Sequence, residues 1–156
     1  MCCRLTMPLR PKPKERPRHR GSFAYTPKET KEYEEAVKHY YERDCGLPPT
    51  DKPVMVTFIF NFAVPKSCSK KEQAVKLLGT CPYSNRPDLD NIEKAVMDAL
   101  NGLAFKDDCQ VVAKVSLKRF WHHNSVMIMI EEMEEIDYEH GVFSGYGVPK
   151  SDSEGV

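Results

Sequence analysis

The sequence has 156 residues, of which 40% are hydrophobic and 29% charged, and 23 Lys/Arg balance 23 Asp/Glu. These values are typical of one soluble domain with short tails. They exclude a membrane-spanning protein, because no apolar run approaches the ~18 residues that a transmembrane helix needs. The N-terminus has no apolar secretory segment, so we expect a cytoplasmic protein. The six cysteines show no zinc-site spacing, and in a reducing cytoplasm we expect free thiols.

Charge is distributed unevenly along the chain. Residues 1–20 carry seven Lys/Arg and one Glu, whereas residues 131–156 carry eight Asp/Glu and one Lys. We therefore expect a basic, Pro- and Arg-rich arm over 1–20, a domain over 21–132 and an acidic, flexible tail over 133–156. A basic arm with an acidic tail suggests a nucleic-acid partner, although two solvated tails would explain the same charges.

The first predicted helix follows the basic arm. Thr26 is its expected N-cap, Pro27 suits the first helical position and Glu29 completes a capping box. Gly46 ends this helix.

The remaining predicted elements follow in chain order. Residues 52–62 alternate between two faces and predict a strand, and Ser69 caps a short helix that ends at Leu78. Residues 109–121 and 125–133 predict two more strands, and the short turn between them predicts a hairpin. With an N-terminal strand left open, this order predicts an α+β fold, a two-layer structure with a mixed sheet and helices packed largely on one face.

The stretch "RPDLDNIEKAVMDALNGLAFKDD", residues 86–108, carries acidic pairs on both sides of an amphipathic helix. Its helix is expected to begin near Asp90, with Lys94 almost opposite the apolar stripe. The apolar stripe recurs at helical spacing and comprises Ile92, Ala95, Val96, Ala99, Leu100 and Leu103.

The acidic pairs have two explanations. Asp88 and Asp90 can cap the helix and Asp90 can pair with Lys94, in which case the acids are structural. Alternatively, these two acids and the pair at 107–108 converge on a hard cation, because oxygen-only ligands suit Mg²⁺, Mn²⁺ or Ca²⁺. A calcium-binding EF-hand is excluded, because Glu93 occupies the position that requires glycine. A nucleotide-sugar transferase can use a DxD motif, but nothing here resembles a nucleotide-binding domain.

The combination "RPDLDNIEKAVMDALNG", "FKDDCQVV" and "KRF" resembles the RusA family of Holliday-junction resolvases of phages and prophages. The openings "PKPKERPRHR" and "YTPKET" and the strand followed by "VPKS" are also similar, so the resemblance covers roughly residues 8–131. It implies a homodimeric, Mg²⁺-dependent endonuclease, with Mn²⁺ as a substitute, that nicks four-way DNA junctions symmetrically in recombination and repair. By this resemblance Asp88, Asp90 and Asp108 bind metal and Lys94 is catalytic. Cys109 stands where the family has a small residue.

Further roles follow as hypotheses. Lys94 would contact the scissile phosphate, and Asp107 is as well explained by a supporting or solvated role. Arg16, Arg18, Lys118 and Arg119 are expected to contact the DNA backbone, although each is equally explained as an ordinary exposed charge. The alternatives to a resolvase are a nuclease for other branched DNA, such as flaps or forks, and a junction-binding protein without catalysis. The acidic tail lies outside the resemblance. The protein is expected to act in the bacterial cytoplasm, or in that of a phage host.

Overall fold

The computed structural model describes residues 2–15, 18–20, 23–78 and 81–133. Its strands are β1 (Cys2–Met7), β2 (Arg18–Arg20), β3 (Phe23–Tyr25), β4 (Val54–Ala63), β5 (Val111–Trp121) and β6 (Ser125–Glu132). Its helices are α1 (Lys28–Asp44), α2 (Lys70–Leu77), α3 (Leu89–Leu100) and the short 3-10 helix η1 (Asp108–Gln110). Four strands form a mixed sheet in the order β1-β6-β4-β5, and β2 pairs with β3 in a separate ribbon.

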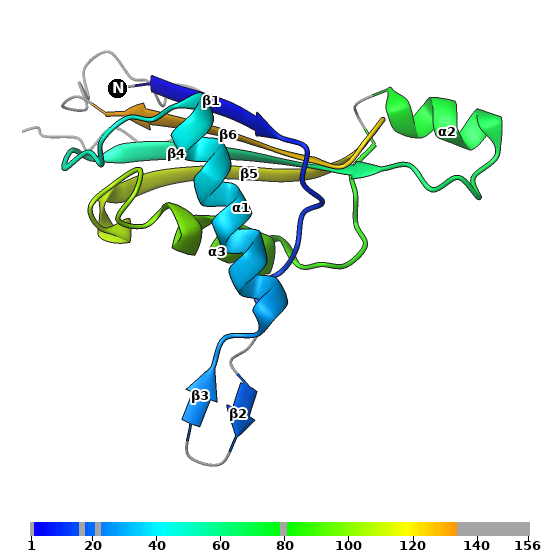
Figure 1. Cartoon of the computed structure of the whole chain (residues 1–156). Helices are drawn as coiled ribbons and strands as arrows, with labels where there is room; N and C mark the ends of the chain where they lie inside the picture. The colour runs from blue at the N-terminus through cyan, green and yellow to red at the C-terminus, as the bar shows by residue number, and fades with distance from the viewer. Residues whose placement is uncertain (1, 16–17, 21–22, 79–80, 134–156) are drawn as a thin grey trace, which may run out of the picture.

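The helices are arranged unequally about the sheet. Helices α1 and α3 cover one face, α2 lies beyond the end of the sheet, and the β2–β3 ribbon projects past the beginning of α1 (Figure 1). This arrangement confirms the predicted α+β fold with helices largely on one face. None of the helices in the described part of the chain is long and apolar enough to span a membrane.

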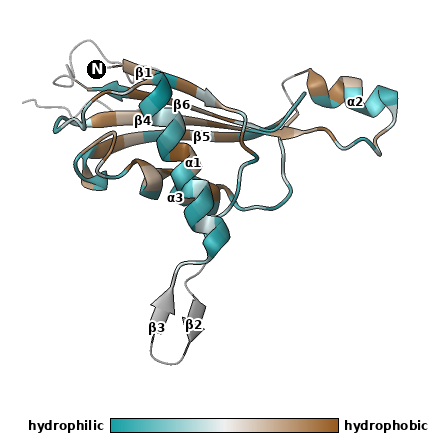
Figure 2. Cartoon of the chain, in the orientation of Figure 1, coloured by the Kyte–Doolittle hydropathy of each residue, from teal (hydrophilic) through white to brown (hydrophobic). Residues whose placement is uncertain are grey.

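The core lies between the sheet and these two helices. Val54, Val56, Phe58 and Phe60 of β4 are fully buried, as the alternating pattern predicts. Hydrophobic residues concentrate along the strands, while the visible surface of α1 is largely hydrophilic (Figure 2). Burial of each large apolar side chain contributes about 1.5–3 kcal/mol to folding before entropy is counted. The core therefore holds α3 rigidly against the sheet.

Strand β1 fills the position that the sequence left open. It pairs antiparallel with β6 at one edge of the sheet. The expectation of free thiols is wrong for Cys3 and Cys45, which form a disulfide with Cα atoms 6.0 Å apart. They are 42 residues apart in sequence, so only the packing of β1 beside the end of α1 brings them within bonding range. Because the sheet begins at residue 2, the predicted basic arm 1–20 includes β1, and the proposed domain division stays a prediction.

The predicted hairpin of β5 and β6 is wrong. Strand β4 lies between them, parallel to β5 and antiparallel to β6. The three residues after Trp121 therefore cross the end of β4, a span of about 10 Å at ordinary strand spacing. The Asn124 side chain stabilises this connection, because its Oδ1 accepts a hydrogen bond from the Ala63 N–H at 3.0 Å. Turn length alone cannot reveal a strand inserted from elsewhere in the chain.

The two predicted helix caps have different outcomes. The Ser69 cap is confirmed, with a complete capping box formed by Ser69 and Glu72. The Thr26 cap is wrong, because Pro27 itself is the N-cap with extended backbone (ψ 146°) and the helix begins at Lys28. The Pro27 carbonyl accepts the first helical hydrogen bond, from Thr30 N–H at 3.1 Å.

Candidate functional site

The beginning of α3 exposes two carboxylates. Asp88 is the N-cap residue, but its side chain makes no capping hydrogen bond. Asp90 lies in the first turn, and both residues are exposed. The helix dipole favours negative charge here, which offsets part of their mutual repulsion. The carboxylate of Asp88 is therefore free to bind a ligand rather than occupied as a cap.

Lys94 lies on the exposed side of α3. One helical turn separates it from Asp90, and it is exposed while Ala95 and Val96 beside it are buried. This position confirms the predicted helical orientation. An ammonium group one turn from two carboxylates can contact an anion held at the same end of the helix.

Lys118 holds the backbone that leads into Asp88. Its Nζ donates to the carbonyl of Asn85 at 2.8 Å and to that of Pro87 at 2.7 Å. The Tyr83 N–H also donates to the Lys118 carbonyl at 3.2 Å. Predicted as a DNA contact, Lys118 thus has partners inside the protein, and it positions the candidate site.

Arg119 is also bound internally. Its Nε donates to Asn61 Oδ1 at 2.8 Å, and its guanidinium lies 4.3 Å from the centre of the Trp121 ring. Asn61 is buried and donates in turn to Ser125 Oγ at 2.9 Å. These bonds tie β5, β4 and β6 together. Of the other predicted DNA contacts, Arg16 lies outside the described residues and Arg18 lies in β2.

Asp107 and Asp108 differ in their surroundings. Asp107 caps η1, because its Oδ1 accepts from the Cys109 N–H at 2.9 Å while Gln110 completes the capping box. Hydrogen bonds from Cys109 lower the pKa of Asp107 below its ordinary value. Asp108 is exposed in the first turn of η1. Asp107 thus stabilises the start of η1, whereas the exposed Asp108 does not cap this helix.

The predicted metal ligands lie at two ends of the molecule. Asp88 is held beside Lys118, near the end of β5, whereas Asp108 directly precedes the beginning of β5 at Val111. Residues 111 and 118 are roughly 23 Å apart at the rise of a strand. Within the described residues, no group of three or more His, Cys, Asp or Glu side chains is placed to hold a metal ion. One chain alone therefore does not assemble the three predicted ligands.

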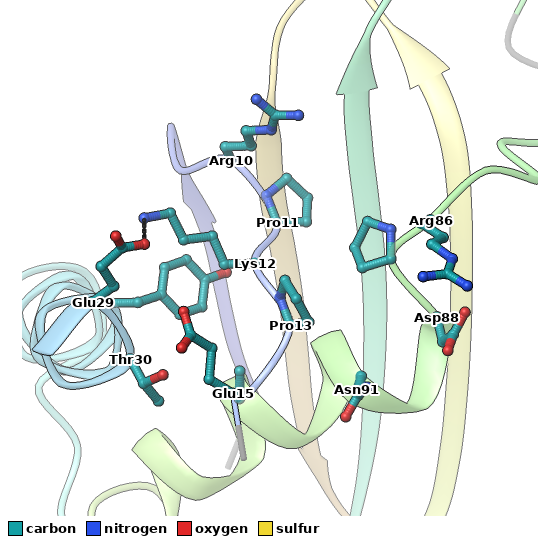
Figure 3. Close-up of a pocket in the computed structure, with 13 residues that line it drawn as sticks. Arg10, Pro11, Lys12, Pro13, Glu15, Glu29, Thr30, Arg86, Asp88 and Asn91 are labelled. Atoms are coloured by element: carbon teal, nitrogen blue, oxygen red, sulfur yellow. Dashed lines mark ion pairs between the residues drawn. The ribbon is translucent and has the colours of Figure 1, made fainter. Parts of the chain in front are cut away.

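A cavity adjoins Asp88 that the sequence did not predict. It has a volume of about 540 Å³ and lies between residues 10–15, α1 and the beginning of α3 (Figure 3). Arg10 and Arg86 line it together with Asp88. Arg86 directly precedes the acidic motif, and that adjacency was a usable signal. Arg10 lies in the predicted basic arm, but nothing in its spacing distinguished it from the other basic residues there.

Comparison with known proteins gives two matches. The profile of the family described as Endodeoxyribonuclease RusA matches residues 8–131. "Uncharacterized protein YqaN" of Bacillus subtilis (strain 168) is 43% identical over 74 residues, which are 45% of this chain and 51% of that protein. The matched segment thus covers about half the length of this curated relative.

Proposed function

The chain belongs to the RusA family of endodeoxyribonucleases, and on this premise we propose that it resolves four-way DNA junctions by paired, symmetric nicks. The observation that carries the proposal is the beginning of α3, where Asp88 is exposed at the N-cap without forming a cap. Asp90 and Lys94 stand exposed within the next turn and a half. The reaction would serve recombination and repair in the cytoplasm of a bacterium or of a phage host.

We expect the activity to require Mg²⁺, with Mn²⁺ as a substitute. Asp88 and Asp90 offer only oxygen ligands, which suit these hard cations. When bound, the ion would activate water and stabilise charge on the leaving oxygen. Lys94, which repels the ion but attracts phosphate, would orient the scissile phosphodiester and stabilise its developing charge.

A second copy of the chain would complete this site. Asp108 lies too far from Asp88 within one chain, whereas a two-fold dimer with its β5 strands antiparallel would bring the partner's Asp108 towards Asp88 and Asp90. Strand β5 is at the edge of the sheet, and Val115 and Leu117 on it are 44% and 39% exposed. Such a dimer would carry two sites related by symmetry, as paired nicks require.

Helix α2 supports the same dimer. It has eight residues and none of them is buried, although helices shorter than about 12 residues rarely persist without packing partners. Val75 and Leu78 at this helix are 53% and 73% exposed. We therefore propose that α2 packs against the second copy as well.

The function is tested by cleavage of synthetic four-way, three-way and flap substrates side by side. We expect the four-way junction to be cut fastest, by two nicks at symmetric positions, and only with Mg²⁺ or Mn²⁺ present. Equal cutting of all three substrates would instead indicate a general branched-DNA nuclease. Junction binding without any cutting by the wild type would indicate a binding protein.

The Asp90→Asn variant is the matched control for this assay. It keeps the size and hydrogen-bonding capacity of the side chain and removes its charge. Nicking should fall by more than about a hundredfold, while binding to the four-way junction persists. Wild-type nicking by the variant would contradict the assignment of Asp90.

A further inference from the structure

The cavity beside Asp88 is built from apolar walls and a charged rim. Pro11 and Pro13 line it (Figure 3), together with Pro87 and Tyr33. Its volume of about 540 Å³ falls within the range of small-molecule sites. The backbone that forms one wall is fixed on α3, because the Lys14 N–H donates to the Asn91 carbonyl at 3.0 Å.

Two buried hydroxyls line this cavity on α1. Thr30 and Tyr33 are 4% and 6% exposed, and within the described residues neither hydroxyl has a hydrogen-bond partner of normal geometry. Burial raises the pKa of Tyr33 to about 12, an effect that the nearby backbone of Lys12 only partly offsets. Buried hydroxyls are nearly always hydrogen-bonded, so Thr30 and Tyr33 offer two hydrogen-bonding positions to a polar group that enters the cavity.

The rim of the cavity carries charges of both signs, because Arg10, Lys12 and Arg86 line it together with Glu15, Glu29 and Asp88. Arg10 and Arg86 are exposed, and neither forms an ion pair with another described residue. The third cation is Lys12, whose Nζ lies 3.9 Å from Glu29 Oε2. At this distance and exposure the ion pair is weak and screened by solvent. Among the described residues, the guanidinium groups of Arg10 and Arg86 thus have no ion-pair partner, and they can bind a phosphate-bearing group with a flat ring at the mouth of this cavity.

We propose that this cavity binds one unpaired nucleotide of the strand that is cut. The base would lie against the proline rings of the wall, as a flipped base packs against apolar side chains, with its edge towards Thr30 and Tyr33 and with Arg10 and Arg86 on the flanking phosphates. Extracting a base costs a few kcal/mol and is easiest where pairing is already disturbed, as at a branch point. Because Asp88 lines the same cavity, the bound nucleotide is adjacent to the site of cleavage.

The two hydroxyls would also make the cavity selective for the base that it binds. A base bound there presents its polar edge to Thr30 and Tyr33, so that bases able to hydrogen-bond with both are preferred. The cavity therefore selects the base at one of the two positions of the dinucleotide that is cut at the branch point. This inference rests on the proposed junction cleavage and adds to it the hydroxyls of Thr30 and Tyr33 as the groups that select the DNA sequence.

The inference is tested with Thr30→Val, which keeps the shape of the side chain and removes the hydroxyl. The rate ratio between the best and the worst dinucleotide should fall about tenfold, the effect of one hydrogen bond. Stability should not fall, because the removed group has no partner. Thr57→Val, on the sheet face away from the helices, is the matched control and should keep the wild-type ratio.

A direct readout uses 2-aminopurine at successive positions near the nick, in junctions bound by Asp90→Asn. The 2-aminopurine fluorescence should rise at one position per strand. The rise should be smaller when the junction is bound by the double variant Thr30→Val/Asp90→Asn. An unchanged dinucleotide ratio in Thr30→Val, or no unstacked position, would overturn the inference while junction cleavage stands. If the wild type cuts no junction at all, the proposed function fails first.

Discussion

Single residues divide into those that shape the site and those that remain free for chemistry. Asp107 and Asp108 are neighbours, yet Asp107 caps η1 and Asp108 is exposed without a cap to form. Lys118 and Lys94 show the same contrast, because Lys118 binds backbone carbonyls before Asp88 while Lys94 is exposed. Substitutions within each pair should therefore separate stability and positioning from catalysis.

The first prediction concerns the two aspartates. Asp107→Ala should lower Tm by a few degrees at most, because it removes a cap, and should lower nicking less than about tenfold. Asp108→Asn should leave Tm unchanged and abolish nicking. Thermal unfolding and a junction-cleavage assay on the two variants measure both effects. Loss of stability in Asp108→Asn would contradict its exposed, uncapped position.

Asp107 should also contribute a pH dependence. Hydrogen bonds from Cys109 lower its pKa in the folded protein, so its stabilisation is fully present above the unfolded value of about 4. The stabilisation is lost as the pH falls through the lower, folded value. Urea unfolding from pH 5 to pH 2.5 should thus show wild type and Asp107→Ala converging at the acid end. A difference that grows towards acid pH would give the pKa shift the opposite sign.

The prediction for Lys118 separates positioning from DNA contact. Lys118→Met should misplace Asp88 and lower the nicking rate by about 10- to 100-fold. The slope of log affinity against log salt should stay unchanged, because no phosphate contact is lost. Arg86→Met is the comparison. Its slope of log affinity against log salt should become shallower by about 1, the value of one lost phosphate contact. A reduced slope in Lys118→Met would restore its assignment as a DNA contact.

Among the elements, α3 is the one that the site depends on. Its buried face packs on the sheet, and Glu93, whose side chain is 8% exposed, pairs with Lys114 of β5 at 2.5 Å. Lys14 forms an ion pair with Asp98 on the other side of the helix. Burial tends to lower the pKa of Lys14, but the carboxylates of Asp98 and Glu34 outweigh it and raise that pKa. These bonds fix α3 between β5 and the segment that lines the cavity.

The Glu93–Lys114 pair yields a double-mutant prediction. Lys114→Met should lower the free energy of unfolding by about 1–3 kcal/mol, because it leaves the buried Glu93 carboxylate unpaired. The double variant with Glu93→Leu should recover most of this loss, since replacing both partners by apolar groups is often neutral. Urea unfolding of the single and double variants measures the coupling. Additive losses would mean that the two side chains do not interact.

How far the sequence predicted these elements depends on how local their causes are. The α3 stripe, the alternation in β4 and the Ser69 cap depend on nearby residues, and all were predictable. The placement of β4 between β5 and β6, and the Cys3–Cys45 bond, depend on contacts distant in sequence. Turn chemistry at 122–124 carries no information about them. For the same reason the cavity could not be foreseen, because three separate segments form it.

For the whole molecule, the principal consequence is that one chain separates the predicted ligands. Asp88 follows Pro87, whose carbonyl binds Lys118 near one end of β5, and Asp108 precedes the other end of that strand. The exposed apolar residues of β5 and α2 support a second copy that would unite them. In the proposed dimer, the second copy would therefore be needed for catalysis and not only for the second nick.

Subunit mixing tests this link. Asp88→Asn and Asp108→Asn should each be inactive alone, but their mixed dimer should regain one intact site. Unfolding and refolding the two variants together should restore nicking to about a quarter of the wild-type level, since half of the dimers are mixed and each has one site. No restoration, with mixed dimers present, would mean that both acids act from the same chain. Full activity of either single variant would remove that acid from the site.

The most direct measurement of the central claim uses a supercoiled plasmid that extrudes a cruciform. Paired nicks across the junction within one binding event convert it to linear DNA, whereas isolated nicks give open circles. The wild type with Mg²⁺ should yield linear product mapped to the cruciform, and Asp90→Asn should leave the plasmid supercoiled. Open circles as the main product, formed equally on a plasmid without the cruciform, would contradict paired junction resolution.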